Sequence, residues 1–177
     1  MKNYHELIAQ SFEFPNQEFE VKEHQLYFNG VNLMEIIKLH GTPLKLTYLP
    51  KISDQIQAAK NYFARAMAKR NYPGSYTYCY CTKSNHFQFV LEEALKNDIH
   101  LETSSTYDIS IIAHLFAKGQ INKQTYIICN GYKKPLYLEK IGDLIDAGFE
   151  HCMPILDNLH ELDYFEKHTK NAYNFGM

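Results

Sequence analysis

Apolar and polar positions alternate with two different periods along most of this chain. Short apolar runs with a period of two recur, and each is followed by a segment in which apolar residues return every third or fourth position. The first pattern is typical of strands and the second of amphipathic helices. Beyond Gly74 the pattern predicts four strands, each followed by a helix, near residues 75–82, 99–103, 125–129 and 152–156.

The even spacing of these strands predicts how they are connected. A parallel connection needs a dozen or more residues, usually contains a helix, and is right-handed. The fold class is therefore α/β. Two architectures fit: an open doubly wound sheet, or the first half of a (β/α)8 TIM-type barrel, for which eight strands are needed to close. Residues 171–177 resemble the approach to one more strand.

The chain before Gly74 has a different organisation. Residues 1–23 are acidic and aromatic and predict an irregular or helical lead-in. A strand-helix-strand segment follows, in which Gly41 ends the helix and Ser53 is a candidate N-cap for the next one. Its predicted parts are a strand at 25–28, a turn at 29–30, a helix at 32–39, a strand at 44–49 and a helix to about residue 69. We expect two regions: the lead-in and this segment over residues 1–50, and a partial barrel domain over residues 51–177.

Composition and charge narrow the class of protein. Hydrophobic residues make up 45% and charged residues 21%, which suits a globular domain, and the net charge of −2 argues against a nucleic-acid partner. The apolar runs are far shorter than the ~20 residues that a membrane helix needs. The start of the chain has no secretory pattern, so a cytoplasmic location is expected. The four cysteines contain no C-x-x-C pair and are expected to be reduced core residues, and no metal-binding spacing is present.

The most unusual segment is SYTYCYCTKSNHF, residues 75–87. Strand alternation places Cys79, Cys81 and Lys83 on one face, with Lys83 at the carboxyl end of the strand. That edge is where α/β proteins bind ligands, and a lysine in a partly dry pocket there is a Schiff-base nucleophile. The alternative is a solvated loop lysine, which is the more common case for this residue type. His86 is expected to face solvent or the first helix.

The next two strand ends also carry polar residues. Glu102 ends the second strand and needs a partner, for which Lys83 at the neighbouring strand end is the candidate. The hydroxyls that follow predict either an anion-binding turn or simple helix capping by Ser105 or Thr106, supported by Asp108.

Asn130 and Gly131 follow the third strand and predict a tight turn at the same edge, which is either part of the site or an ordinary loop. Tyr132 and Lys133 lie close to this turn in the sequence. Asp157 and Asn158 end the fourth strand and are equally suited to capping the helix that follows.

Four segments, taken together and in this order, resemble the arginine decarboxylases of the barrel-type, alanine-racemase-like family that depends on pyridoxal 5'-phosphate. They are GTPLKLTYLP at 41–50, YCYCTKSNHF at 78–87, HLETSSTYD at 100–108 and ICNGYKK at 128–134. The resemblance implies that Lys83 carries the cofactor, that Glu102 sets the charge of the site, and that Ser105 and Asn130 help to bind the cofactor. The reaction implied is conversion of arginine to agmatine and carbon dioxide, in polyamine biosynthesis, by a homodimer.

The resemblance runs from about residue 27 to about residue 165, and other features of the family are not found. Family members continue with an arginine, a histidine over the cofactor ring, a Gly-rich phosphate loop, a glutamate and a carboxy-terminal β domain. We therefore expect an amino-terminal portion that is inactive alone. The alternatives are a non-catalytic half-barrel that oligomerises, or a related enzyme that decarboxylates ornithine, lysine or diaminopimelate or that racemises an amino acid.

Overall fold

The computed structural model describes residues 18–177, which divide into two compact units after residue 47. The described part of the first unit is a small antiparallel sheet followed by one helix. Its elements are β1 (Phe19–Lys22), β2 (Gln25–Phe28), β3 (Val31–Asn32) and α2 (Leu33–His40). Asn32 caps α2 by accepting hydrogen bonds from two backbone N–H groups, and Gly41 ends it with φ +77°. The predicted strand at 25–28 and the helix after it are confirmed, while most of the lead-in predicted over residues 1–23 lies outside the described residues.

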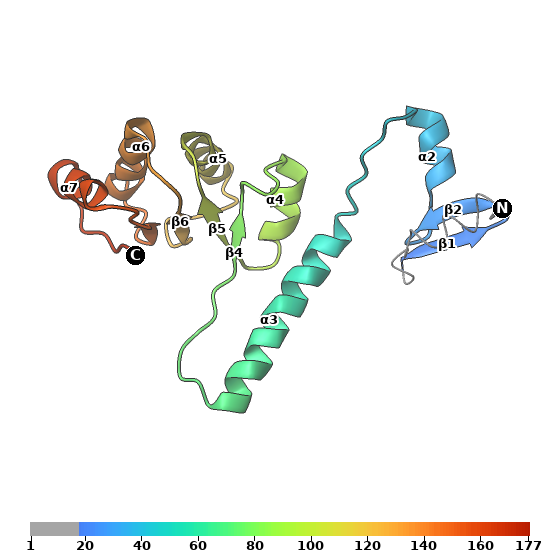
Figure 1. Cartoon of the computed structure of the whole chain (residues 1–177), viewed down its shortest axis with the longest axis horizontal. Helices are drawn as coiled ribbons and strands as arrows, with labels where there is room; N and C mark the ends of the chain where they lie inside the picture. The colour runs from blue at the N-terminus through green and yellow to red at the C-terminus, as the bar shows by residue number, and fades with distance from the viewer. Residues whose placement is uncertain (1–17) are drawn as a thin grey trace, which may run out of the picture. The chain divides into compact units, whose positions relative to one another are not determined.

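The second unit is built from alternating strands and helices (Figure 1). After the long helix α3 (Pro50–Arg70), its elements are β4 (Cys79–Cys81), α4 (Gln88–Leu95), β5 (His100–Thr103), α5 (Thr106–Ala117), β6 (Ile127–Cys129), α6 (Pro135–Asp146), β7 (Cys152–Pro154) and α7 (Leu159–His168). The sheet has the order β4-β5-β6-β7, and all of its strand pairs are parallel. This confirms the α/β prediction.

The strand order also separates the two architectures predicted from the sequence. Each strand pairs with the next one along the chain, and Figure 1 shows α4, α5 and α6 on the same side of the sheet. A doubly wound sheet has helices on both faces and reverses its strand order at one point, whereas a (β/α)8 barrel winds in one direction. The second unit therefore winds as part of a barrel does. Gly176 extends the pattern by a parallel bridge to Ile155, as expected from the approach to a further strand.

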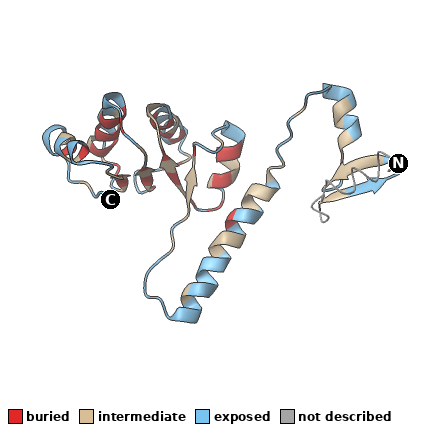
Figure 2. Cartoon of the chain, viewed as in Figure 1, coloured by how far each residue is buried: buried red, intermediate tan, exposed pale blue. Residues whose placement is uncertain are grey.

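The two faces of this sheet have different surroundings. The face toward the helices carries fully buried residues such as Leu101, Ile127 and Cys129, which form the core with the inner sides of the helices (Figure 2). On the other face, Glu102 and Ile128 are only half-buried. The four cysteines are free, but they divide by face: Cys129 and Cys152 are buried in the core, whereas Cys79 and Cys81 are half-buried.

Four predictions about elements before residue 83 are wrong in detail. The described end of the lead-in, predicted to be irregular or helical, contains the strand β1, which pairs with β2. Residues 44–48 are not a strand, because no described strand lies beside them and Leu46 is 50% exposed. Helix α3 begins at Pro50, with Leu49 at the cap position, and Ser53 instead donates a hydrogen bond to Glu93 (2.6 Å). The strand predicted at 75–82 is shortened to β4, since its partner β5 begins only at His100. Within residues 18–177, no helix is both long and apolar enough to cross a membrane.

Candidate active site

The predicted site residues follow neighbouring strands at their carboxyl ends. In the parallel register Cys81 lies beside Glu102, and Glu102 beside Ile128. Lys83 and Asn130 come two residues after Cys81 and Ile128, so both lie at the edge of the sheet where barrel enzymes bind their substrates.

Lys83 lies in a turn that its neighbours anchor on both sides. Thr82 is buried, and both its backbone N–H and its hydroxyl donate to the Glu102 carbonyl (3.0 Å each). Ser84 donates from its backbone N–H and its hydroxyl to the Cys81 carbonyl (3.2 and 2.7 Å). Lys83 itself is exposed and has no hydrogen-bond partner within residues 18–177. The backbone is fixed while the amine is left available.

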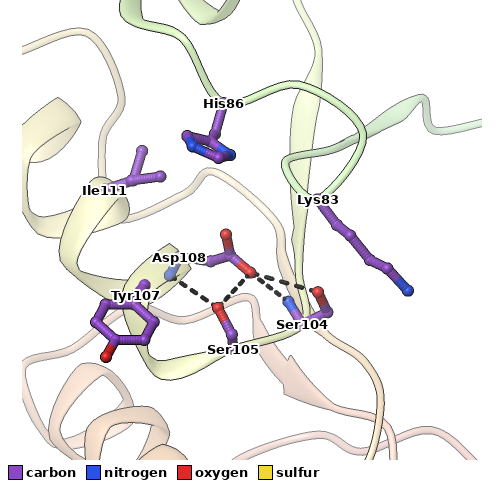
Figure 3. Close-up of a pocket in the computed structure, with 7 residues that line it drawn as sticks. All are labelled: Lys83, His86, Ser104, Ser105, Tyr107, Asp108 and Ile111. Atoms are coloured by element: carbon purple, nitrogen blue, oxygen red, sulfur yellow. Dashed lines mark hydrogen bonds between the residues drawn. The ribbon is translucent and has the colours of Figure 1, made fainter.

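Lys83 lines a cavity of about 570 Å³ (Figure 3). The remaining wall comes from the β4–α4 loop and from the start of α5: His86, Ser104, Ser105, Tyr107, Asp108 and Ile111. Figure 3 shows Lys83 on one side and Tyr107 and Ile111 on the other. The two serines and Asp108 lie between these two sides. The structure thus brings two predicted site residues, Lys83 and Ser105, into one cavity.

Ser104 and Ser105, which line this cavity, form hydrogen bonds that cap the start of α5. Ser105 is the N-cap, as one of the two predicted capping residues, and its hydroxyl accepts from the Asp108 N–H (3.4 Å). The buried Asp108 carboxylate in turn accepts from the Ser104 N–H (2.9 Å) and from the Ser105 hydroxyl (3.0 Å). These reciprocal bonds hold the start of α5, and with it this wall of the cavity, in place.

The other two predicted site residues contact each other. The Asn130 side-chain amide donates to the Glu102 carboxylate (3.2 Å). The ion pair expected between Glu102 and Lys83 is absent from the described part of the chain: Lys83 lies in the turn after β4, and Asn130 takes the place of the partner. Burial, and after it the Glu102 charge, raise the pKa of the neighbouring Cys79 thiol, which therefore stays protonated at neutral pH.

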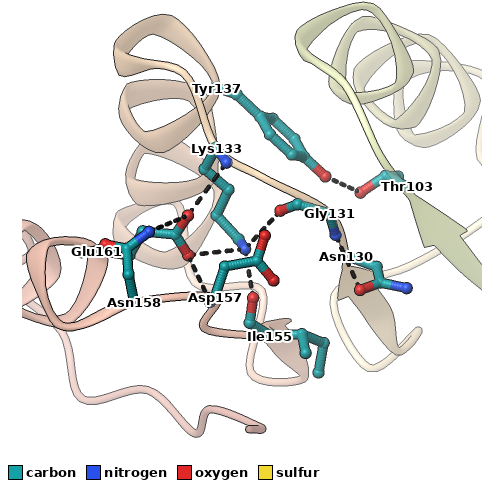
Figure 4. A network of polar contacts seen from close by, with 9 residues as sticks. All are labelled: Thr103, Asn130, Gly131, Lys133, Tyr137, Ile155, Asp157, Asn158 and Glu161. Atoms are coloured by element: carbon teal, nitrogen blue, oxygen red, sulfur yellow. Dashed lines mark hydrogen bonds and ion pairs between the residues drawn. The ribbon is translucent and has the colours of Figure 1, made fainter.

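A second lysine at this edge, Lys133, donates all of its ammonium protons to groups of the protein (Figure 4). Lys133 is 3% exposed, and its ammonium donates to the Gly131 carbonyl (2.9 Å), the Ile155 carbonyl and the Glu161 carboxylate (3.0 Å). An ammonium has three protons, and all three are used. Lys133 is therefore unsuited to reacting with a ligand, and Lys83 is the better nucleophile of the two.

His86 is the residue that sequence reasoning left out of the site. It is exposed, as expected, yet its ring also lines the Lys83 cavity. No hydrogen bond to the imidazole is present among the described residues. One indication of this was present in the sequence, since His86 lies three residues after Lys83. The direction of its ring could not be predicted, because it depends on how the loop from Ser84 to Phe87 turns into α4.

The known proteins to which this chain is similar are decarboxylases. No family model matches it. A biosynthetic arginine decarboxylase from Nostoc sp. is 31% identical over 117 residues, covering 63% of this chain and 16% of the relative. The biosynthetic arginine decarboxylase of Prochlorococcus marinus is 31% identical over 135 residues, covering 74% of this chain and 20% of the relative. The chain thus spans a fifth or less of the length of these curated relatives.

A solved structure extends the match in fold. The diaminopimelate decarboxylase from M. jannaschii, in co-complex with L-lysine, superposes with a TM-score of 0.71 at 19% identity, over 88% of this chain and 33% of that protein. At this identity the likeness concerns the fold. The chain is a relative of the biosynthetic arginine decarboxylases over part of their length, and it has the fold of the amino-terminal part of a decarboxylase barrel.

Proposed function

We propose that this chain forms part of a pyridoxal-phosphate-dependent decarboxylase that converts arginine to agmatine and carbon dioxide, with Lys83 as the cofactor lysine. The observation that carries the proposal is an exposed lysine that lines a cavity at the carboxyl edge of a parallel sheet and has no hydrogen-bond partner among residues 18–177. Two of the four sequence segments that resemble arginine decarboxylases, residues 78–87 and 100–108, contain every lining residue of this cavity except Ile111, and the relatives are named arginine decarboxylases.

The residues present fit the cofactor. A volume of about 570 Å³ lies within the usual range for small-molecule sites, ~300–1,000 Å³. Lys83 supplies the amine that the cofactor aldehyde requires, and His86 offers a free ring nitrogen. When bound, pyridoxal phosphate supplies the electron sink for the electrons left when the carboxylate departs.

Each predicted site residue has a role that follows from its contacts. Glu102, oriented by Asn130, places a negative charge at the carboxyl end of β5 and favours cationic groups nearby. Ser105 holds the start of α5 as a rigid wall. A smaller cavity of about 230 Å³ shares Ser105 and Tyr107 with the first one and provides adjacent space for a substrate.

The remainder of the proposal concerns the native protein. It includes arginine as substrate, a homodimer in the full-length form, a cytoplasmic location and a role in polyamine biosynthesis. Ornithine, lysine and diaminopimelate are the competing substrates, since the fold neighbour is a diaminopimelate decarboxylase and this chain covers only 16% of one arginine decarboxylase relative.

A second candidate function is a non-catalytic half-barrel that associates through its sheet. The half-buried face favours it: there Ile128 and Met153 lie in register on neighbouring strands, and adjoining, partly exposed apolar side chains are often covered by another chain or segment.

Carbon dioxide release separates these candidates. The native protein that carries residues 1–177 would be given pyridoxal phosphate and carboxyl-labelled arginine, ornithine, lysine or diaminopimelate in turn. The proposal predicts release from arginine with an equal amount of agmatine, and loss of release in Lys83→Ala. Release that persists unchanged in Lys83→Ala would overturn it, and release from none of the four substrates would favour the non-catalytic module.

A further inference from the structure

A buried ion pair joins two loops at the carboxyl edge of the sheet (Figure 4). The side chains of Lys133 and Glu161 are 0% and 3% exposed, and Nζ lies 3.0 Å from Oε2. Burying two charges carries a desolvation penalty that an apolar pair of similar size would not carry. Stability alone is therefore a weak explanation for this pair.

The contacts of the pair show what it holds. Lys133 Nζ donates to the carbonyl of Gly131, in the loop between β6 and α6, and to the carbonyl of Ile155, directly after β7. Glu161 accepts from the backbone N–H of Lys133 and from that of Asp157, at 3.1 Å each. Both charges thus bind backbone groups of both loops, and the two loops are clamped to each other.

Gly131 is the point at which this clamp meets the Lys83 site. Its φ of +75° is in the left-handed region, which a residue without a side chain adopts at little cost. Its N–H donates to the Asn130 Oδ1 (2.8 Å), while its carbonyl is held by Lys133. With Oδ1 engaged in this way, the Asn130 Nδ2 faces the Glu102 carboxylate.

We propose that Lys133 and Glu161 are positioning residues: through Gly131 and Asn130 they fix the direction of the Glu102 carboxylate at the end of β5, the strand next to the one that leads to Lys83. This inference rests on the proposed function, because it assigns an effect on the reactivity of Lys83 toward the cofactor. Lys133 contacts neither the cavity nor the cofactor site itself and acts only through the loop.

A double-mutant cycle tests this route. The native protein would be mixed with pyridoxal phosphate and borohydride, and the rate at which Lys83 becomes labelled would be measured for the wild type, Lys133→Met/Glu161→Gln, Asn130→Ala and the combined variant. The pair variant is expected to label about tenfold more slowly than the wild type, and less than about twofold more slowly when Asn130 is already alanine. Lys167→Met, at an exposed lysine on α7, the helix that carries Glu161, serves as the matched control and should leave the rate unchanged.

The outcomes separate the inference from the function on which it rests. An equal slowing with and without Asn130 would mean that the pair acts on the fold alone, and would overturn the inference. Labelling of the wild type at any residue other than Lys83 would overturn the proposed function and the inference with it.

A second measurement needs no cofactor. The Asn130 side-chain amide protons are expected to exchange faster with solvent in Glu161→Gln than in the wild type, by NMR on the cofactor-free protein. This substitution keeps an acceptor at the same position, so it also decides the question should the pair variant fail to fold. Unchanged exchange would contradict a link from the pair to Asn130.

Discussion

Lys83 and Lys133 lie near the same edge of the sheet, but their different burial and hydrogen bonding suit them to different roles. Lys133 is buried and all three of its ammonium protons are donated. Lys83 is exposed on an anchored turn, and its amine has no hydrogen-bond partner among residues 18–177. The sequence supported Lys83 by strand alternation and by resemblance. It offered no means of recognising that Lys133 is structural, because the partner Glu161 is 28 residues away in another loop.

The His86 ring gives a prediction at this scale. Replacing His86 by alanine removes a free ring nitrogen from the cavity wall, so pyridoxal phosphate should bind roughly tenfold more weakly, since a hydrogen bond to a charged group is worth ~1.5–3 kcal/mol. Equilibrium dialysis would measure the change. His114→Ala, an exposed histidine on α5 that does not line the cavity, is the control. Equal affinity in His86→Ala and the wild type would remove His86 from the site.

His100 gives a prediction about pH. Burial lowers the pKa of His100, and its Nδ1 accepts a hydrogen bond from the Tyr126 N–H (3.0 Å), which requires that nitrogen to be unprotonated. As pH falls through about 6.5 the unfolded chain takes up this proton first, so the free energy of unfolding falls with it. His100→Asn keeps an acceptor but cannot titrate. Between about pH 7 and about pH 5, chemical denaturation should show a smaller loss of stability for this variant than for the wild type; the same loss in both would contradict this reading.

At the scale of elements, local signals predicted most of the second unit. Strand and helix periods placed β5, β6 and β7 within a few residues, and short polar side chains marked the caps at Ser105 and Asn158. The prediction of a strand failed where the segment has no neighbouring strand to pair with. Residues 44–48 alternate like a strand but have no neighbouring ladder in the described structure, and a strand forms only when its backbone groups are paired.

The cap of α5 gives a prediction for an element. Ser105→Ala removes the N-cap acceptor and one donor to the buried Asp108, so the free energy of unfolding should fall by ~1–2 kcal/mol. Ser110→Ala, an exposed serine in the same helix, should change it little. Urea denaturation compares the two. An equal effect of both substitutions would show that the cap contributes nothing beyond helix propensity.

For the whole molecule, the sheet has one well-covered face and one that is half-covered. Its parallel strand order and its helices on one side are those of the amino-terminal part of a decarboxylase barrel. The superposition with the solved decarboxylase covers 88% of this chain and 33% of that protein. Strand spacing predicted the parallel order. The sequence alone left the choice between open sheet and barrel undecided, because that choice depends on which side of the sheet each helix takes.

This half-covered face gives a prediction about association. The chain of residues 1–177 should self-associate through it, and Ile128→Lys should weaken that association because it places a charge in an apolar contact. Leu159→Lys, at a 77% exposed leucine on α7, is the control. Sedimentation equilibrium would show the difference, and a wild-type monomer at high concentration would contradict the prediction.

The central claim is that Lys83 binds pyridoxal phosphate, and covalent mapping tests it most directly. The protein would be incubated with the cofactor, reduced with borohydride and digested, and the pyridoxyl group located by mass spectrometry. We predict the label on Lys83 in the wild type and its loss in Lys83→Arg, with Lys133 unlabelled in both. A label on Lys133 or Lys134, or an equal amount of label in wild type and Lys83→Arg, would contradict the account.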